Sequence, residues 1–270
     1  MNVGFIGMGN MGQMLVTALA RAHALQPGEL FASTRDPDKL RRLAGSVPGL
    51  QVAYSNRELA QRCQVIFLCL KPGETRAVLT EIAPHLTPDR LLVAITNTID
   101  IAALEGTTRA RVAKVIPSMV QSIQRGVSLL MFGDRCTTDD KAFLVRLMGA
   151  ISQPVPIIES QARVASDLSS CGPAFVSYIL RAFAHAARQY QPDLPVDTIN
   201  LLIRVTAAAT CELLERTGMT FDDVITRVST PGGITADGIK VLDEQLAGVW
   251  EQVIETTIVK EEAKKARFEL

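Results

Sequence analysis

The hydrophobic positions of the chain follow two different periods. From residue 1 to about 158, short β-branched apolar runs alternate with amphipathic stretches, which is typical of βαβ units on a parallel, doubly wound sheet. We expect strands at Val3 to Ile6, Leu30 to Ser33, Val65 to Leu70, Leu91 to Ile95, Val112 to Ile116, Val127 to Phe132 and Val155 to Ile158. The pattern therefore predicts an α/β fold for this half.

The alternation stops at Gln161, where Ala- and Leu-rich segments begin. We expect an all-helical half with helices at about 161–190, 196–216, 220–228, 234–243 and 245–267. The change of period near Glu159 predicts two domains, residues 1–159 and residues 160–270. The stretch Leu201 to Leu214 carries few charges and is apolar on more than one face, which is typical of a buried helix. We therefore expect the helical half to form a homodimer or a higher homo-oligomer; a monomer with one well-filled core is the alternative.

Composition and charge exclude several classes of function. Lys and Arg number 28, as do Asp and Glu, and aromatic residues make up only 5%, so nucleic acid and anionic membranes are not expected partners. The five cysteines form no CxxC pair and show no metal-ligand spacing, which predicts a reducing, cytoplasmic compartment and no metal. The N-terminus lacks the features of a signal peptide, and no apolar run is long enough to span a membrane.

A glycine motif directly follows the first predicted strand: Gly7-Met8-Gly9-Asn10-Met11-Gly12. In a Rossmann-type unit, Gly7 makes the tight turn, Gly9 admits a pyrophosphate to the backbone N–H groups, and Gly12 allows the helix to pack closely on the strand. The N-terminus of the helix, at Asn10 and Met11, then favours phosphate charge. The motif predicts a dinucleotide site, with a structural glycine turn as the alternative.

The end of the second strand, Ala32-Ser33-Thr34-Arg35, indicates which dinucleotide binds. An acidic residue there accepts hydrogen bonds from the ribose of NAD, whereas two hydroxyls and a guanidinium suit a 2′-phosphate. We therefore expect NADP(H). The alternative is that Arg35 is solvated and Asp36 caps the next helix.

Two further segments lie where a doubly wound sheet exposes its carboxyl edge. Leu70-Lys71-Pro72 ends a strand, so Lys71 or its neighbours are expected to face the ribose or the pyrophosphate. Asn56 opens a helix and is either a capping residue, the simpler interpretation, or a contact to adenosine.

The helical half contains two segments of small residues, Ser169 to Phe175 and Ser229 to Thr235. In the second, Pro231-Gly232-Gly233 leads into a helix, so the N–H groups of Gly233, Ile234 and Thr235 are expected to be free to receive a carboxylate, beside the hydroxyls of Thr230 and Thr235. An N-capped turn between helices is the alternative.

Together these motifs resemble the pyrroline-5-carboxylate reductase family, over residues 1 to about 268. Ser169 to Phe175 looks like its Ser-Gly-Ser-Gly-Pro-Ala-Tyr, and Ser229 to Thr235 looks like its Thr-Ser-Pro-Gly-Gly-Thr-Thr. The resemblance implies reduction of 1-pyrroline-5-carboxylate, or a similar cyclic imine acid, to proline. It also implies a carboxylate held at the helix start, Thr235 at the ring nitrogen, and interlocked dimers. We expect Ser169 and Thr235 to be the catalytic hydroxyls.

The chain departs from that family pattern at several positions. Ser118 and Met119 stand where the family has Asn and Thr, and Cys171 replaces a serine. The segment from Arg163 to Phe175 is similar to the late-competence ComER branch, so the second hypothesis is a weakly active or non-catalytic nucleotide-binding regulator with a competence or sporulation role. A third, a β-hydroxyacid dehydrogenase, requires a lysine near residue 170, and the chain has none between Lys141 and Lys240.

Overall fold

The computed structural model describes residues 1–267, which fall into two compact units. Unit 1 comprises Met1–Pro173 together with the segment from Thr256 onward, and unit 2 comprises Ala174–Glu255. These units are defined by contacts, whereas the predicted boundary near Glu159 marks the change from strands to helices. That boundary stays a prediction.

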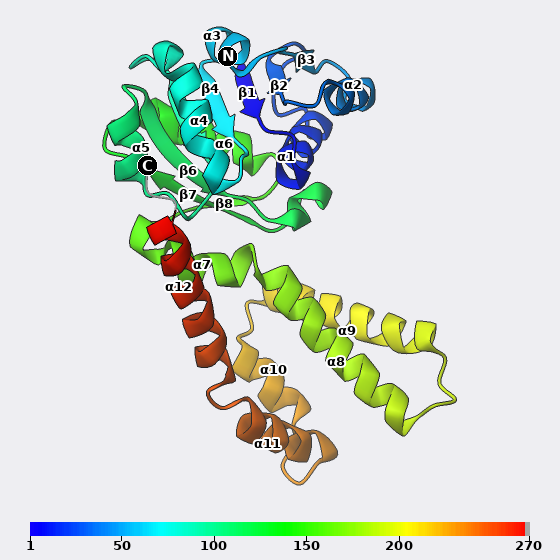
Figure 1. Ribbon diagram of the computed structural model, residues 1–270. Helices are drawn as coiled ribbons and strands as arrows, with labels where there is room; N and C mark the ends of the chain where they lie inside the picture. Colours follow the sequence, from blue (N-terminus) through cyan, green and yellow to red (C-terminus); the bar gives the residue numbers. More distant parts are fainter. Residues whose placement is uncertain (268–270) are drawn as a thin grey trace. The chain divides into compact units, whose positions relative to one another are not determined.

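Unit 1 is built on one eight-stranded sheet with the order β3-β2-β1-β4-β5-β6-β7-β8 (Figure 1). The strands are β1 (Val3–Ile6), β2 (Leu30–Ser33), β3 (Gln51–Val52), β4 (Val65–Leu68), β5 (Leu91–Ala94), β6 (Arg111–Ile116), β7 (Val127–Phe132) and β8 (Gln153–Pro156). All seven predicted strands are present, and the doubly wound α/β fold is confirmed. The two-residue β3 was missed because it is too short to show a period.

The sheet is parallel as expected except at β7, which runs antiparallel to β6 with Ile116 opposite Leu129. The connection between them contains only the short 3₁₀ helix η2 (Met119–Ile123), whereas a parallel crossover needs a dozen residues or more. Strand β8, parallel to β7, begins two residues before the predicted start. Its prolines are tolerated because β8 is an edge strand.

Helices cover both faces of the sheet. One apolar cluster joins the side chains of Val3 and Phe5 to helices α1 (Asn10–Arg21), α2 (Pro37–Ser46) and α6 (Thr138–Gly149). The cluster on the other face joins Ile66 and Leu68 to α3 (Asn56–Arg62), α4 (Pro72–Ile82), α5 (Ile101–Thr107) and α7 (Ala162–Ser169). Alternate residues of each strand point to opposite faces, which explains why both clusters draw on the same strands.

Unit 2 consists of helices that are connected by short turns (Figure 1). The helices are α8 (Gly172–Tyr190), α9 (Val196–Thr217), α10 (Phe221–Val228), α11 (Ile234–Leu246) and α12 (Val249–Arg267), and α8 begins and α12 ends in unit 1. Large apolar side chains of α8 and α9 stay exposed in the single chain, including Phe183 and Leu202. Across residues 1–267, no helix combines the length and apolar character that crossing a bilayer requires.

The predicted helix over 161–190 is interrupted between α7 and α8. Pro173 has no N–H to donate to the carbonyl of Ser169, four residues earlier, so the regular pattern of helical hydrogen bonds stops there. The N–H groups of Ser170 and Cys171 both turn back to the carbonyl of Ser166, at 2.9 and 2.8 Å. Expecting one continuous helix was therefore wrong.

Candidate functional site

The glycine loop between β1 and α1 has the geometry that the sequence predicted. Gly7 has a φ of +97°, and its N–H donates to the carbonyl of Ser33 at 2.9 Å. A Cβ on Gly12 would lie 2.1 Å from the carbonyl oxygen of Gly7, so only glycine lets α1 pack this closely. A Cβ on Gly9 would meet nothing within 4 Å, which leaves the backbone open to a ligand on that side.

A cavity of about 680 Å³ opens at the carboxyl ends of β1, β2 and β4. It brings together seven of the predicted cofactor residues: Gly7, Gly9, Thr34, Arg35, Asn56, Leu70 and Lys71. The other five do not line it but lie in the same elements: Asn10 and Met11 in the first turn of α1, Gly12 against the loop, Ser33 buried in β2 and Pro72 at the start of α4. The donors and the open loop fit a dinucleotide phosphate, although contact with a cofactor stays a prediction.

Asn56 links two walls of this cavity. Its side-chain oxygen accepts a hydrogen bond from the hydroxyl of Ser33 at 2.9 Å, and its amide nitrogen donates to a carboxylate oxygen of Glu81 at 2.8 Å. The helix is capped instead by Ser55, whose hydroxyl accepts from the N–H of Glu58. The simpler interpretation of Asn56 as the cap was therefore wrong, and its role as an adenosine contact stays a prediction.

The rim of the cavity carries both signs of charge. The exposed guanidinium of Arg35 forms an ion pair with Glu74, in the first turn of α4. Asp36 caps α2 by accepting from the N–H groups of Lys39 and Asp38, and these hydrogen bonds, that of Lys39 above all, lower the pKa of its carboxyl. Sequence reasoning missed Lys39, Glu74 and Glu81 as cavity residues. Their only signal was their position in helices that follow β2 and β4.

A second cavity, of about 460 Å³, lies at the next two strands of the same edge. It is lined by the segment after β5, by Ile116 at the end of β6, and by side chains of α7 and α12. The N–H of Ile95 donates to the carbonyl of Leu68, so the two cavities belong to adjacent strands. A dinucleotide crosses the carboxyl edge where the strand order reverses, and this cavity lies where its second half would continue.

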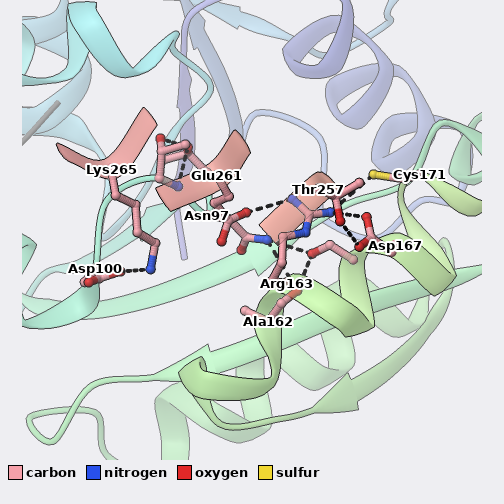
Figure 2. Close-up of polar contacts among 12 residues, drawn as sticks. Asn97, Asp100, Ala162, Arg163, Asp167, Cys171, Thr257, Glu261 and Lys265 are labelled. Carbon is pink, nitrogen blue, oxygen red and sulfur yellow. Dashed lines mark hydrogen bonds and ion pairs between the residues drawn. The ribbon is translucent and has the colours of Figure 1, made fainter. Parts of the chain in front are cut away.

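Charged and polar side chains form a network beside the second cavity (Figure 2). Arg163 pairs with Asp167 at 2.6 Å and with Glu261 at 2.7 Å, and it donates to the sulfur of Cys171 at 3.4 Å. Burial would lower the pKa of Arg163, but the charges of Asp167 and Glu261 outweigh it and raise that pKa. Asp167 also accepts from the hydroxyl of Thr257. The guanidinium thus stays charged and ties α7 to α12.

Further polar contacts near this network involve the loop that follows β5 (Figure 2). Asn97 donates to the hydroxyl of Ser166 at 2.7 Å and to the carbonyl of Ala162 at 3.4 Å, and Lys265 pairs with Asp100 at 2.7 Å. Sequence reasoning did not find these polar contacts, because Asn97, Arg163 and Glu261 come from three distant segments. Their only local signal was the spacing of Arg163 and Asp167, four residues apart on one helix.

Ser169, the expected catalytic serine of unit 1, uses both of its polar groups within the protein. Its hydroxyl donates to the carbonyl of Ala165 at 2.7 Å, and its carbonyl accepts from the hydroxyl of Ser118 at 3.2 Å. Ser118 is buried, whereas Met119 is exposed. The structure therefore joins Ser169, where the chain matches the family pattern, to Ser118, where it departs from that pattern. The catalytic role of Ser169 stays a prediction.

The Pro-Gly-Gly motif lies in unit 2 and starts α11. Gly232 has a φ of +75°, and Gly233 is the N-cap, where a Cβ would lie 2.7 Å from the hydroxyl of Thr230. The expectation that the N–H of Gly233 is free was wrong, because it donates to the carbonyl of Thr230 at 2.8 Å and closes the turn. Ile234 and Thr235, in the first turn, are exposed. The motif thus belongs to a different unit from the nucleotide residues.

Comparisons with known proteins support both halves of this description. The family model described as pyrroline-5-carboxylate reductase dimerisation matches residues 159–264, and the model described as NADP oxidoreductase, coenzyme F420-dependent, matches residues 2–98. The chain is 33% identical to ComE operon protein 4 of Bacillus subtilis over 97% of this chain and 96% of that protein. It is 28% identical to pyrroline-5-carboxylate reductase 3 of the same organism, over 96% and 95%.

Two solved structures share the fold at lower identity. A pyrroline-5-carboxylate reductase from Coxiella burnetii superposes with a TM-score of 0.86 at 24% identity, covering 100% of this chain and 98% of that one. The Plasmodium falciparum pyrroline carboxylate reductase with NADP bound gives a TM-score of 0.82 at 23% identity, covering 99% and 98%. The arrangement of strands and helices is therefore that of these proteins over the whole chain.

Proposed function

The chain belongs to the pyrroline-5-carboxylate reductase family, and from that premise we propose that it reduces 1-pyrroline-5-carboxylate, or a similar small cyclic imine acid, to proline with NADPH. One observation carries the proposal: the chain keeps both parts such a reaction needs, an open glycine loop on a nucleotide-sized cavity and a glycine-led helix start. A nucleotide-binding regulator would need only the first of these parts and would be free to lose the second.

The start of α11 supplies the proposed anchor for the substrate. The first N–H groups of a helix lack partners within the helix, and those of Ile234 and Thr235 stand at the positive end of the helix dipole. A carboxylate is the ligand that such a helix start favours. A Cβ on Gly233 would lie 2.7 Å from the hydroxyl of Thr230, so the tight turn that starts α11 requires glycine at this position.

The proposed reaction adds a hydride to the imine carbon and a proton to the imine nitrogen. NADPH, when bound, supplies the hydride. An iminium is already electrophilic, so the protein mainly has to hold the substrate in line with the cofactor. Thr235, exposed in the first turn of α11, is the hydroxyl that we assign to the ring nitrogen, where it orients the substrate. Ser169 is proposed as a second, supporting hydroxyl.

We further propose that the protein is a homodimer or a higher homo-oligomer and acts in the cytoplasm. Exposed apolar side chains on α8 and α9, such as Phe183 and Leu202, are the kind of surface that a second subunit covers. The five free cysteines favour a reducing compartment. The chain has no net positive charge that would favour nucleic acid or anionic membranes, so the imine acid and a second copy are the proposed partners.

A second candidate function is supported by specific observations. The chain aligns with ComE operon protein 4 at higher identity than with the reductase of the same organism, and it departs from the reductase pattern at Ser118, Met119 and Cys171. A nucleotide-binding regulator with little or no catalysis would keep the cavity and could vary at these positions.

The test is oxidation of NADPH by the purified protein with 1-pyrroline-5-carboxylate, beside a direct NADPH titration. Turnover at rates typical of enzymes, on the order of 1–1000 per second, supports the reductase. Tight NADPH binding without turnover supports the regulator. Absence of NADPH binding contradicts both.

A further inference from the structure

We propose that Glu74 sets the cofactor selectivity of this protein, because its carboxylate competes with the 2′-phosphate of NADPH for the guanidinium of Arg35. The inference rests on the proposed NADPH site and adds a residue that acts against the preferred cofactor. Its consequence is a smaller preference for NADPH over NADH than Arg35 alone would give.

The two residues meet at the rim of the nucleotide cavity, 39 positions apart in the chain. Arg35 follows β2, where a Rossmann-type site reads the ribose 2′-position, and Glu74 reaches it from the first turn of α4. The Arg35 side chain is 86% exposed and that of Glu74 is 37% exposed. Exposed ion pairs are weak, so an incoming phosphate can displace this carboxylate.

The charges that line the cavity show why one carboxylate matters. Three cations, Arg35, Lys39 and Lys71, face three acids, Asp36, Glu74 and Glu81, so the lining has no positive excess for a phosphate dianion. Asp36 accepts from N–H groups of its own helix, and Glu81 accepts from Asn56. Glu74 is the acid that pairs with the guanidinium expected to bind the 2′-phosphate.

Removing the charge of Glu74 should therefore act on NADPH more than on NADH. NADH carries a 2′-hydroxyl, which gains little from a freed guanidinium. An exposed pair is worth up to about 1 kcal/mol, so Glu74→Gln should tighten NADPH binding about three- to five-fold. Glutamine keeps the size and shape of the side chain at this half-exposed position, so the fold is expected to be unaffected.

The experiment measures the dissociation constants of both cofactors by titration, in wild type, Glu74→Gln, Arg35→Ala and the double variant. The ratio of the NADH constant to the NADPH constant should rise in Glu74→Gln and fall in Arg35→Ala. In the double variant it should match Arg35→Ala alone, because Glu74 then has no guanidinium to compete for. Glu105→Gln, which removes another carboxylate paired with an arginine, Arg135, away from the cavity, should leave the ratio unchanged.

An unchanged ratio in Glu74→Gln overturns the inference, and so does an equal rise with and without Arg35. The titration uses no imine substrate, so it is independent of the reductase assignment. A shifted ratio in Glu74→Gln without turnover of 1-pyrroline-5-carboxylate supports the inference and contradicts the reductase assignment. Turnover with an unshifted ratio supports the reductase assignment and contradicts the inference.

Discussion

The hydroxyl of Ser118 donates a hydrogen bond to the carbonyl oxygen of Ser169, 3.2 Å away and 51 residues later in the chain. That carbonyl needs an outside partner because Pro173, at the position of the next helical donor, has no N–H. Ser118, which departs from the family pattern after β6, therefore supplies a hydrogen bond to a backbone carbonyl at the break between α7 and α8.

Replacing Ser118 with alanine should lower stability by about 1 kcal/mol, because it leaves the Ser169 carbonyl without this hydrogen bond. Chemical unfolding of the two proteins measures the difference. Ser122→Ala, an exposed serine in the same short 3₁₀ helix η2, is the matched control and should change nothing. Equal stability of the Ser118 variant would show that water replaces the hydroxyl.

Restoring the family residues, with Ser118→Asn and Met119→Thr together, should raise turnover of 1-pyrroline-5-carboxylate. Ser118 is the N-cap and Met119 the first residue of the 3₁₀ helix η2 after β6, where the reductase pattern carries an amide and a hydroxyl. The measurement is kcat with saturating NADPH. A double variant that folds normally and gains no activity would favour the regulator.

Changing Gly9 to aspartate should abolish NADPH binding while leaving the fold intact. The space around a Cβ at this position is empty within 4 Å, and the φ of −69° suits any residue, so the new carboxylate fits the protein and repels the pyrophosphate. Cofactor titration measures the loss of NADPH binding, and thermal unfolding shows whether the fold is intact. Gly12→Ala is the contrast, because its Cβ would lie 2.1 Å from the Gly7 carbonyl and should destabilise unit 1.

Thr235→Ala should reduce kcat by ten-fold or more, an order typical of losing one positioned hydrogen bond in a transition state, and leave NADPH affinity unchanged. Thr235 is exposed in the single chain and belongs to a different unit from the nucleotide cavity, so its loss is not expected to disturb cofactor binding. Unaltered turnover would remove the assignment of Thr235 to the ring nitrogen.

Acid should weaken the protein partly through Asp140. Burial raises the pKa of this carboxyl, but hydrogen bonds from Arg111 and from Thr137 outweigh it, so the pKa in the folded state lies below the ordinary 3.8. The stability it contributes is present above that ordinary value and is lost as the pH falls through the lower, folded value. Asp140→Asn should therefore cost about 2 kcal/mol at pH 7, and the difference from wild type should shrink below pH 3.8.

Most of the sheet could be predicted because its strands are continuous apolar runs. Such a run can be recognised without knowing which strands lie beside it. The direction of β7 leaves no trace in the strand itself, because a strand has the same apolar pattern whichever way it runs. The signal was the short connection, residues 117–126 between the two predicted strands, which is too short for a parallel crossover. The break before Gly172 was visible as Pro173, but the apolar period on either side favoured one helix.

The candidate site divides in the same way. The glycine loop and the start of α11 are local features, so the sequence alone predicts the turn at Gly7 and the helix start at Gly233. The ion pair of Arg35 and Glu74 joins segments 39 positions apart in the chain. The ion pair of Arg163 and Glu261 joins segments 98 positions apart. Such pairings follow from the fold, and no local pattern marks them.

The discontinuity of unit 1 has a consequence for how the protein is made. Its last contributors, among them Glu261 and Lys265, are translated after all of Ala174–Glu255, yet they bind Arg163 and Asp100. On the ribosome, all strands of the sheet are therefore complete before α12 is made, and α7 stays incompletely covered while the helices of unit 2 emerge. Until then, Arg163 and Asp100 lack the partners that α12 supplies in the finished chain.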